Sequence, residues 1–229
     1  WSMDYQGLPP VDVFIDCEPD VAVPPLLDAL GPGPARAAPG LAKEFPKPAG
    51  DKLTVDHLAT ALREAVGGRP TSLTHVSLSW NGATWIFDHP LDYLGSDGGG
   101  GVGGGPGISV GAALALKDGG RLAVAVRGDG DFLMGVTALW TAAHYRIPLL
   151  IVVANNRSFF NDELHQERVA RMRNRPIENR WVGQRISEPD IDLAAMARAQ
   201  GAQGFGPVTA IADLGPTFAK AIAAVEAGA

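Results

Sequence analysis

Two short, fully apolar segments separated by one helical segment constrain the fold of this chain most. Residues 122–126 and 149–154 contain no polar side chain, and the segment 132–145 between them has the pattern of a helix. Continuous apolar strands that alternate with helices are typical of a parallel sheet with both faces covered. The sequence therefore predicts an α/β fold, with a parallel sheet and helices on both of its faces.

The rest of the chain divides into three predicted parts. Residues 31–50 are rich in proline, which opposes both helices and central strands, so we expect a Pro/Gly-rich linker there. Residues 1–30, with a β-rich run at 11–16 and a helix at 21–30, precede it, and residues 51–229 form the α/β domain. Within that domain we expect a first strand at 73–78 and further helices at 54–66, 108–116, 162–172, 190–199 and 213–227.

Composition excludes several classes of protein. The net charge of −6 has the wrong sign for a dedicated nucleic-acid binder. The longest apolar run, which contains residues 148–154, is far shorter than the roughly 20 residues that cross a bilayer, and we expect no signal peptide. The single cysteine, Cys17, excludes an internal disulfide and a cysteine zinc site. We expect a cytoplasmic protein with neither nucleic-acid nor membrane partners.

Polar or glycine-rich segments follow the predicted strands, at residues 79–82, 128–131 and 155–158. Ligands of open α/β sheets bind beyond the carboxyl ends of the strands, and a right-handed crossover brings Asp129 and Asn156 close together. A carboxylate and an amide oxygen suit Mg²⁺, which keeps places for phosphate and water. Gly128 and Gly130 allow the backbone to approach a phosphate closely. The residues thus predict a Mg²⁺-bridged diphosphate at this edge.

The order Gly128-Asp129-Gly130, then 24 residues, then Asn155-Asn156 resembles a family motif. It is similar to the thiamin-diphosphate (ThDP) motif of the superfamily that includes acetolactate synthase and benzoylformate decarboxylase. The glycine-rich residues 101–113 resemble that family's cofactor loop and the helix after it. The resemblance covers about residues 54–202, the diphosphate-binding (PP) domain, while residues 1–30 resemble the end of the family's middle domain.

The resemblance implies a role for each matching residue. The side chains of Asp129 and Asn156 and the backbone carbonyl of Ser158 would bind Mg²⁺. Val102 would support the bent cofactor from beneath. Other residues expected at the cofactor are Asn81, Gly82, Gly103, Gly128, Gly130 and Asp131.

Asp131 departs from the family, which usually has serine or alanine there. A second carboxylate would repel a phosphate, so we expect Asp131 to cap a helix that begins at Phe132, with a metal-bound water as the alternative partner. Substrate-facing positions are proposed for His89, Phe159 and Phe160, and each has a purely structural alternative.

The basic residues 165–175 also have two interpretations. They could hold a charged substrate tail such as a coenzyme A phosphate. The favoured interpretation is a solvated helix face paired with Glu163, Glu167 and Glu178. A dinucleotide-binding interpretation of Gly98, Gly100 and Gly103 is disfavoured, because no apolar strand leads into that glycine run.

The resemblance implies a ThDP- and Mg²⁺-dependent lyase or transferase. It would make or break a carbon–carbon bond next to a carbonyl, as in 2-oxo acid decarboxylation or acetolactate synthase-like carboligation. A 2-hydroxyacyl-CoA lyase or oxalyl-CoA decarboxylase-like enzyme is an alternative, and a catalytically silent structural or regulatory subunit is another.

In this family a glutamate of a separate pyrimidine-binding (PYR) domain activates the cofactor. Nothing in this sequence matches that domain, so we expect no catalytic residue here. The chain would be the C-terminal part or a subunit of the enzyme. It would work in a homo- or hetero-oligomer with a PYR-bearing chain or segment, on a small 2-oxo acid or acyl substrate.

Overall fold

The structure, a computed structural model, describes residues 11–33, 44–95 and 102–228. The chain divides into two compact units, Trp1–Ala42 and Lys43–Ala229. Residues 34–43 of the predicted linker and residues 96–101 of the glycine-rich loop lie outside the described residues. The three-part division at residues 30/31 and 50/51 stays a prediction.

The first unit contains helix α1 (Pro19–Leu30). Pro19 suits the first turn of this helix, because a backbone N–H at that position would have no partner within the helix. Gly31 ends the helix with φ +63°. The β-rich run at residues 11–16 is not a strand, so that expectation was wrong. A strand needs a neighbour for its backbone hydrogen bonds, and the described residues 11–33 contain no second strand.

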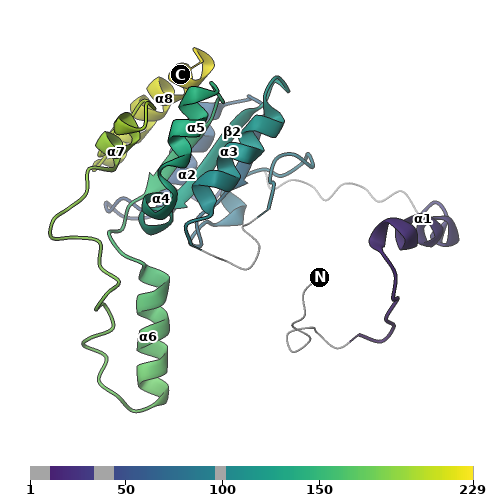
Figure 1. Ribbon diagram of the computed structural model, residues 1–229, viewed down its shortest axis with the longest axis horizontal. Helices are drawn as coiled ribbons and strands as arrows, with labels where there is room; N and C mark the ends of the chain where they lie inside the picture. The colour runs from purple at the N-terminus through teal and green to yellow at the C-terminus, as the bar shows by residue number, and fades with distance from the viewer. Residues whose placement is uncertain (1–10, 34–43, 96–101, 229) are drawn as a thin grey trace. The chain divides into compact units, whose positions relative to one another are not determined.

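The second unit is built on a parallel sheet of three strands in the order β1 (Thr71–His75), β2 (Leu122–Gly128) and β3 (Leu150–Ala154) (Figure 1). β2 is central and pairs in parallel with both neighbours. The first strand lies earlier than the expected 73–78, because a turn from Ser77 to Trp80 takes the chain out of the sheet.

Helices cover both faces of this sheet, as predicted. In β2 and β3, even-numbered residues such as Val124 and Val152 pack against α2 (Val55–Val66) and α8 (Leu214–Glu226). On the other face, Ala123 of β2 packs against α3 (Gly105–Leu116), which lies beside β2 in Figure 1. The alternation follows from the two-residue period of a strand. Thr54 caps α2 by accepting a hydrogen bond from the His57 N–H.

The segment after β2 forms two helices instead of the single helix expected at 132–145. α4 (Asp129–Gly135) begins directly at the strand end, and α5 (Ala138–His144) follows. The break falls where Gly135 packs against the glycine-rich loop. A Cβ at this position would lie 2.6 Å from the Gly103 carbonyl oxygen.

The remaining elements are α6 (Phe160–Met172), α7 (Leu193–Ala199), and the short 3₁₀ helices η2 (Gly82–Thr84) and η4 (Ile211–Asp213). α7 begins later than the expected residue 190, because the Asp192 side chain caps it at the Ala195 N–H. Among the described residues, no helix is long and apolar enough to span a membrane.

Candidate functional site

The carboxyl ends of β2 and β3 bring the two predicted metal ligands to one edge of the sheet. Gly128 at the end of β2 lies in register with Ala154 at the end of β3. Asp129 opens α4 directly after β2, and the Asn155-Asn156 pair follows β3. Strands that are parallel and in register thus place the carboxylate and the amide beside each other.

Asp129 and Asn156 converge on a single backbone N–H group. The Ser158 N–H donates to Asp129 Oδ2 at 3.1 Å and to Asn156 Oδ1 at 3.0 Å. Asn155 makes a similar local turn, accepting from the Arg157 N–H at 3.0 Å. Arg157 has φ +57°, the left-handed region that non-glycine residues rarely adopt. Two Asx turns in succession thus give the loop its shape.

Asp129 is a buried carboxylate without a cationic side-chain partner among the described residues. Its residue is 2% exposed, and only backbone N–H groups bond to it. Burial raises the pKa of Asp129 above its ordinary value, and hydrogen bonds from the Gly130, Asp129 and Ser158 N–H groups lower it only in part. A bound cation would offset this cost of burial.

The donor set at this edge fits Mg²⁺. The available ligands are one carboxylate, one amide oxygen and the backbone carbonyl of Ser158, all hard oxygen atoms. The described part of the chain contains no cluster of three or more His, Cys, Asp or Glu side chains suited to a metal. A magnesium ion at this site would therefore keep several places for phosphate oxygens or water.

Asp131 does not cap a helix from Phe132, so that expectation was wrong. The helix begins three residues earlier, at Asp129, which leaves Asp131 inside its first turn. Its Oδ1 accepts hydrogen bonds from the Gly103 N–H at 2.7 Å and the Gly105 N–H at 3.4 Å. Its Oδ2 lies 3.2 Å from Arg127 Nη1. The carboxylate that would repel a phosphate is therefore neutralised within the protein.

Arg127, which sequence reasoning missed, is fully buried beneath the glycine-rich loop. Its Nη2 donates to the Gly105 carbonyl at 2.6 Å and to Ser109 Oγ at 2.7 Å. A Cβ at position 105 would overlap Arg127 and Asp131, so only glycine fits there. One arginine at the end of an otherwise apolar strand was the available sequence signal.

Glu163 is not on a solvated face, contrary to expectation. It is 1% exposed, and its Oε1 accepts hydrogen bonds from Ser158 Oγ and from Arg185 Nε, the latter at 2.7 Å. Burial alone would raise the pKa of Glu163, but these hydrogen bonds and the charge of Arg185 hold it below its ordinary value. Glu167, by contrast, pairs near the surface with Arg171 and Arg180, as expected of a solvated face.

The other predicted cofactor residues border this edge or make local turns. Gly130 packs so closely under Phe159 that a Cβ would overlap the phenyl ring. Gly103 has φ +98°, and Val102 is about half exposed. Asn81 caps η2, in which Gly82 is the first residue, by accepting from the Ala83 N–H at 3.0 Å.

The predicted substrate-facing residues differ in position. His89 is exposed, and its Nδ1 accepts the Leu91 N–H at 3.0 Å, which stabilises a local turn. Phe159 contacts Gly130 at the site, whereas Phe160 is half exposed at the start of α6. Their contribution to a substrate pocket stays a prediction.

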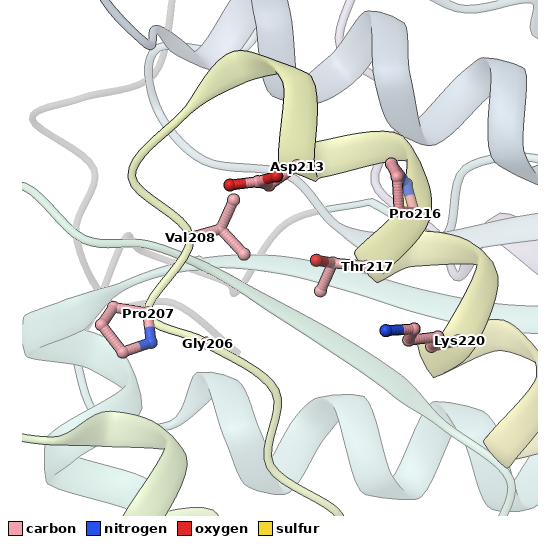
Figure 2. Close-up of a pocket in the computed structure, with 7 residues that line it drawn as sticks. All are labelled: Gly206, Pro207, Val208, Asp213, Pro216, Thr217 and Lys220. Atoms are coloured by element: carbon pink, nitrogen blue, oxygen red, sulfur yellow. The ribbon is translucent and has the colours of Figure 1, made fainter.

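Two hollows lie in the described part of the chain. One, of about 420 Å³, adjoins the candidate site and is lined by Asn156, Arg157, Arg185, Ser187, Glu188 and Asp190. The other, of about 360 Å³, lies between residues 206–208 and the start of α8 (Figure 2). It includes none of the predicted site residues.

Comparison with known proteins gives a consistent picture. Residues 77–228 match the family described as thiamine pyrophosphate enzyme, C-terminal TPP binding domain. Benzoylformate decarboxylase of Pseudomonas aeruginosa is 40% identical over 60 residues, 26% of this chain and 11% of that protein. The mitochondrial acetolactate synthase catalytic subunit of Aspergillus candidus is 31% identical over 125 residues, 55% of this chain and 16% of that protein.

The fold is also similar to solved structures. The thiamine diphosphate-dependent 4-hydroxybenzoylformate decarboxylase of Rhodococcus jostii RHA1 matches with a TM-score of 0.65 and 29% identity. This match covers 86% of the present chain but only 36% of that enzyme. The chain thus spans about a third of that enzyme, and its matches to the two sequence relatives cover less of them.

Proposed function

Because the chain belongs to the thiamine pyrophosphate enzymes and carries their C-terminal TPP binding domain, we propose that it is the cofactor-binding part of a ThDP- and Mg²⁺-dependent lyase or transferase. The proposed reaction makes or breaks a carbon–carbon bond next to the carbonyl group of a small 2-oxo acid. The relatives named above, a benzoylformate decarboxylase and an acetolactate synthase, support this class of reaction.

The observation that carries the proposal is the convergence of Asp129 and Asn156 on the Ser158 N–H. These two side chains and the Ser158 carbonyl would hold Mg²⁺, and the metal would bind the cofactor's diphosphate. Gly128 and Gly130 would let the backbone approach the phosphates. The Arg127–Asp131 pair supports this assignment, because Arg127 neutralises the Asp131 carboxylate, which would otherwise repel a diphosphate.

The bound cofactor would supply the electron sink that carbon–carbon bond cleavage next to a carbonyl requires. The residues of this chain would bind and orient it, with Val102 as the candidate support. The activating glutamate would come from a PYR-bearing chain or segment, and the complete site would form in an oligomer.

Calorimetric titration with ThDP tests the proposal, in the presence and absence of Mg²⁺. We expect Mg²⁺-dependent binding by the wild-type chain, alone or together with a PYR-bearing partner. Asp129→Ala should abolish the metal-dependent part, because it removes the only charged ligand of the set. Binding of NAD in place of ThDP would overturn the proposal, and so would equal ThDP affinity with and without the metal.

A further inference from the structure

We propose that Glu163 is a positioning residue that fixes the Ser158 peptide unit and thereby the oxygen ligands around it. This inference deepens the proposed function and rests on it. Glu163 would not touch the metal or the cofactor. It would act through Ser158, whose N–H already contacts both Asp129 and Asn156.

The Ser158 residue is held from two sides. Its N–H group bonds to Asp129 and Asn156, while its hydroxyl donates to Glu163 Oε1. Ser158 is itself buried, so these groups have little access to water that could replace the bonds. The Ser158 carbonyl, the third candidate ligand, shares a peptide plane with the Phe159 N–H, which donates to the Gln184 carbonyl, so its orientation is restricted as well.

Glu163 is in turn held by a strap of residues 184–186. Arg185 Nε donates to Glu163 Oε1 at 2.7 Å, and Arg185 Nη2 donates to Oε2 at 3.3 Å. The same strap pairs with the metal-ligand loop: Phe159 N–H bonds to the Gln184 carbonyl at 3.0 Å, and Ile186 N–H to the Arg157 carbonyl at 2.8 Å. Glu163 therefore lies between the strap and the loop and bonds to both.

The burial of Glu163 distinguishes it from a surface ion pair. A carboxylate removed from water costs free energy unless it is paired and fully hydrogen-bonded, which Ser158 and Arg185 achieve here. Glu167 lies four residues further along α6 and remains partly exposed. Its side chain accepts hydrogen bonds from Arg171 and Arg180, which both lie outside residues 155–158, so Glu167→Gln is a matched control.

The first experiment needs no cofactor. Amide hydrogen exchange is compared among wild type, Glu163→Gln, Ser158→Ala and Glu167→Gln. We expect exchange at residues 157–159 and 184–186 to be about tenfold faster in Glu163→Gln, since a lost charged hydrogen bond changes a local opening equilibrium by about that factor. Ser158→Ala, which deletes only the hydroxyl, should act in the same direction even if Glu163→Gln folds poorly. Glu167→Gln should leave these segments unchanged.

The second experiment measures the Mg²⁺ concentration at half-saturation, with ThDP in excess. Glu163→Gln should raise this Mg²⁺ concentration about tenfold, and Glu167→Gln should leave it unchanged. The double variant with Glu163→Gln and Ser158→Ala should need little more Mg²⁺ than either single variant. Unchanged Mg²⁺ affinity in Glu163→Gln and Ser158→Ala would overturn the inference.

The two experiments separate failure of the inference from failure of the proposed function. If the wild-type chain with its partner shows no Mg²⁺-dependent ThDP binding, the proposed function fails. The exchange data then decide by themselves whether Glu163 fixes the Ser158 peptide. Unchanged exchange at residues 157–159 in both Glu163→Gln and Ser158→Ala would overturn the positioning role of Glu163 as well.

Discussion

Two of the three carboxylates around the candidate metal site are neutralised by an arginine side chain, and the third is not. On the glycine-rich side, Asp131 is paired with the buried Arg127, and on the α6 side, Glu163 is paired with Arg185. Asp129 lies between them in the site and has only backbone N–H partners among the described residues. The difference supports the proposal that Asp129 is the carboxylate that binds an external cation.

The same comparison explains part of the glycine content. Gly105 and Gly135 are required by close contacts within the protein, against the Arg127–Asp131 pair and the Gly103 carbonyl, and Gly103 is required by its φ of +98°. The glycine-rich loop is therefore packed against α4 through its own backbone. Its conformation near Val102 depends on the Arg127–Asp131 pair.

The largest expected effect comes from removing the charge of the carboxylate that has only backbone partners. Asp129→Asn should weaken Mg²⁺-dependent ThDP binding about a thousandfold, or about 4 kcal/mol. Burial raises the pKa of Asp129, so its charged form opposes folding near neutral pH, and the variant without metal should be more stable than the wild type. Calorimetry and urea unfolding measure the two effects.

Asp131→Asn is the matched comparison for stability. It removes the partner of a buried arginine, so the free energy of unfolding should fall where Asp129→Asn raises it. Loss of stability in both variants would break the distinction between the two carboxylates.

The next effect in size is the loss of the buried arginine. Arg127→Met leaves Asp131 without its cation and removes the bonds to Gly105 and Ser109, so we expect destabilisation by about 3 kcal/mol in urea unfolding. Adding Asp131→Asn should restore part of this, because the stranded charge is then gone. Strictly additive effects would contradict the coupling between the two side chains.

The sequence predicted the parts of this site that depend on strand geometry. Asp129 and Asn156 were placed at one sheet edge because each follows an apolar strand, and parallel strands end together. The roles of Asp131 and Glu163 were not predictable in this way. Gly103 and Arg185, which bond to them, are 28 and 22 residues away and meet them only after the loops have packed. Arg127 is only four residues from Asp131, but the two side chains pair because α4 begins directly after β2.

Substitutions of glycine sharpen the comparison at a smaller scale. Gly105→Ala would force its methyl group into the Arg127–Asp131 pair and should destabilise the protein by about 2 kcal/mol. A methyl group at Gly111, in the same helix, would meet nothing within 4 Å, so Gly111→Ala should stabilise the protein by about 0.5–1 kcal/mol. Thermal unfolding of the two variants measures both changes in stability. Equal changes would show that helix propensity alone determines the effect of a methyl group at these positions.

An effect that vanishes in acid is expected at Asp92, a paired carboxylate outside the site. Burial alone would raise its pKa, but hydrogen bonds from the His89 and Asp88 N–H groups and the ion pair with Arg121 hold that pKa below its ordinary value. A lowered pKa in the folded state contributes stability above the unfolded pKa of about 3.9, and this contribution is lost as the pH falls through the folded value. Asp92→Asn should therefore cost about 1 kcal/mol at pH 7 and progressively less in acid, in urea unfolding from pH 7 to pH 3.

Because burial shifts the pKa of Asp129 in the opposite direction, Asp129→Asn should show the reverse trend, with its stabilisation fading as the pH falls. Parallel pH profiles for the two variants would mean that an arginine partner does not decide how a buried carboxylate contributes to folding.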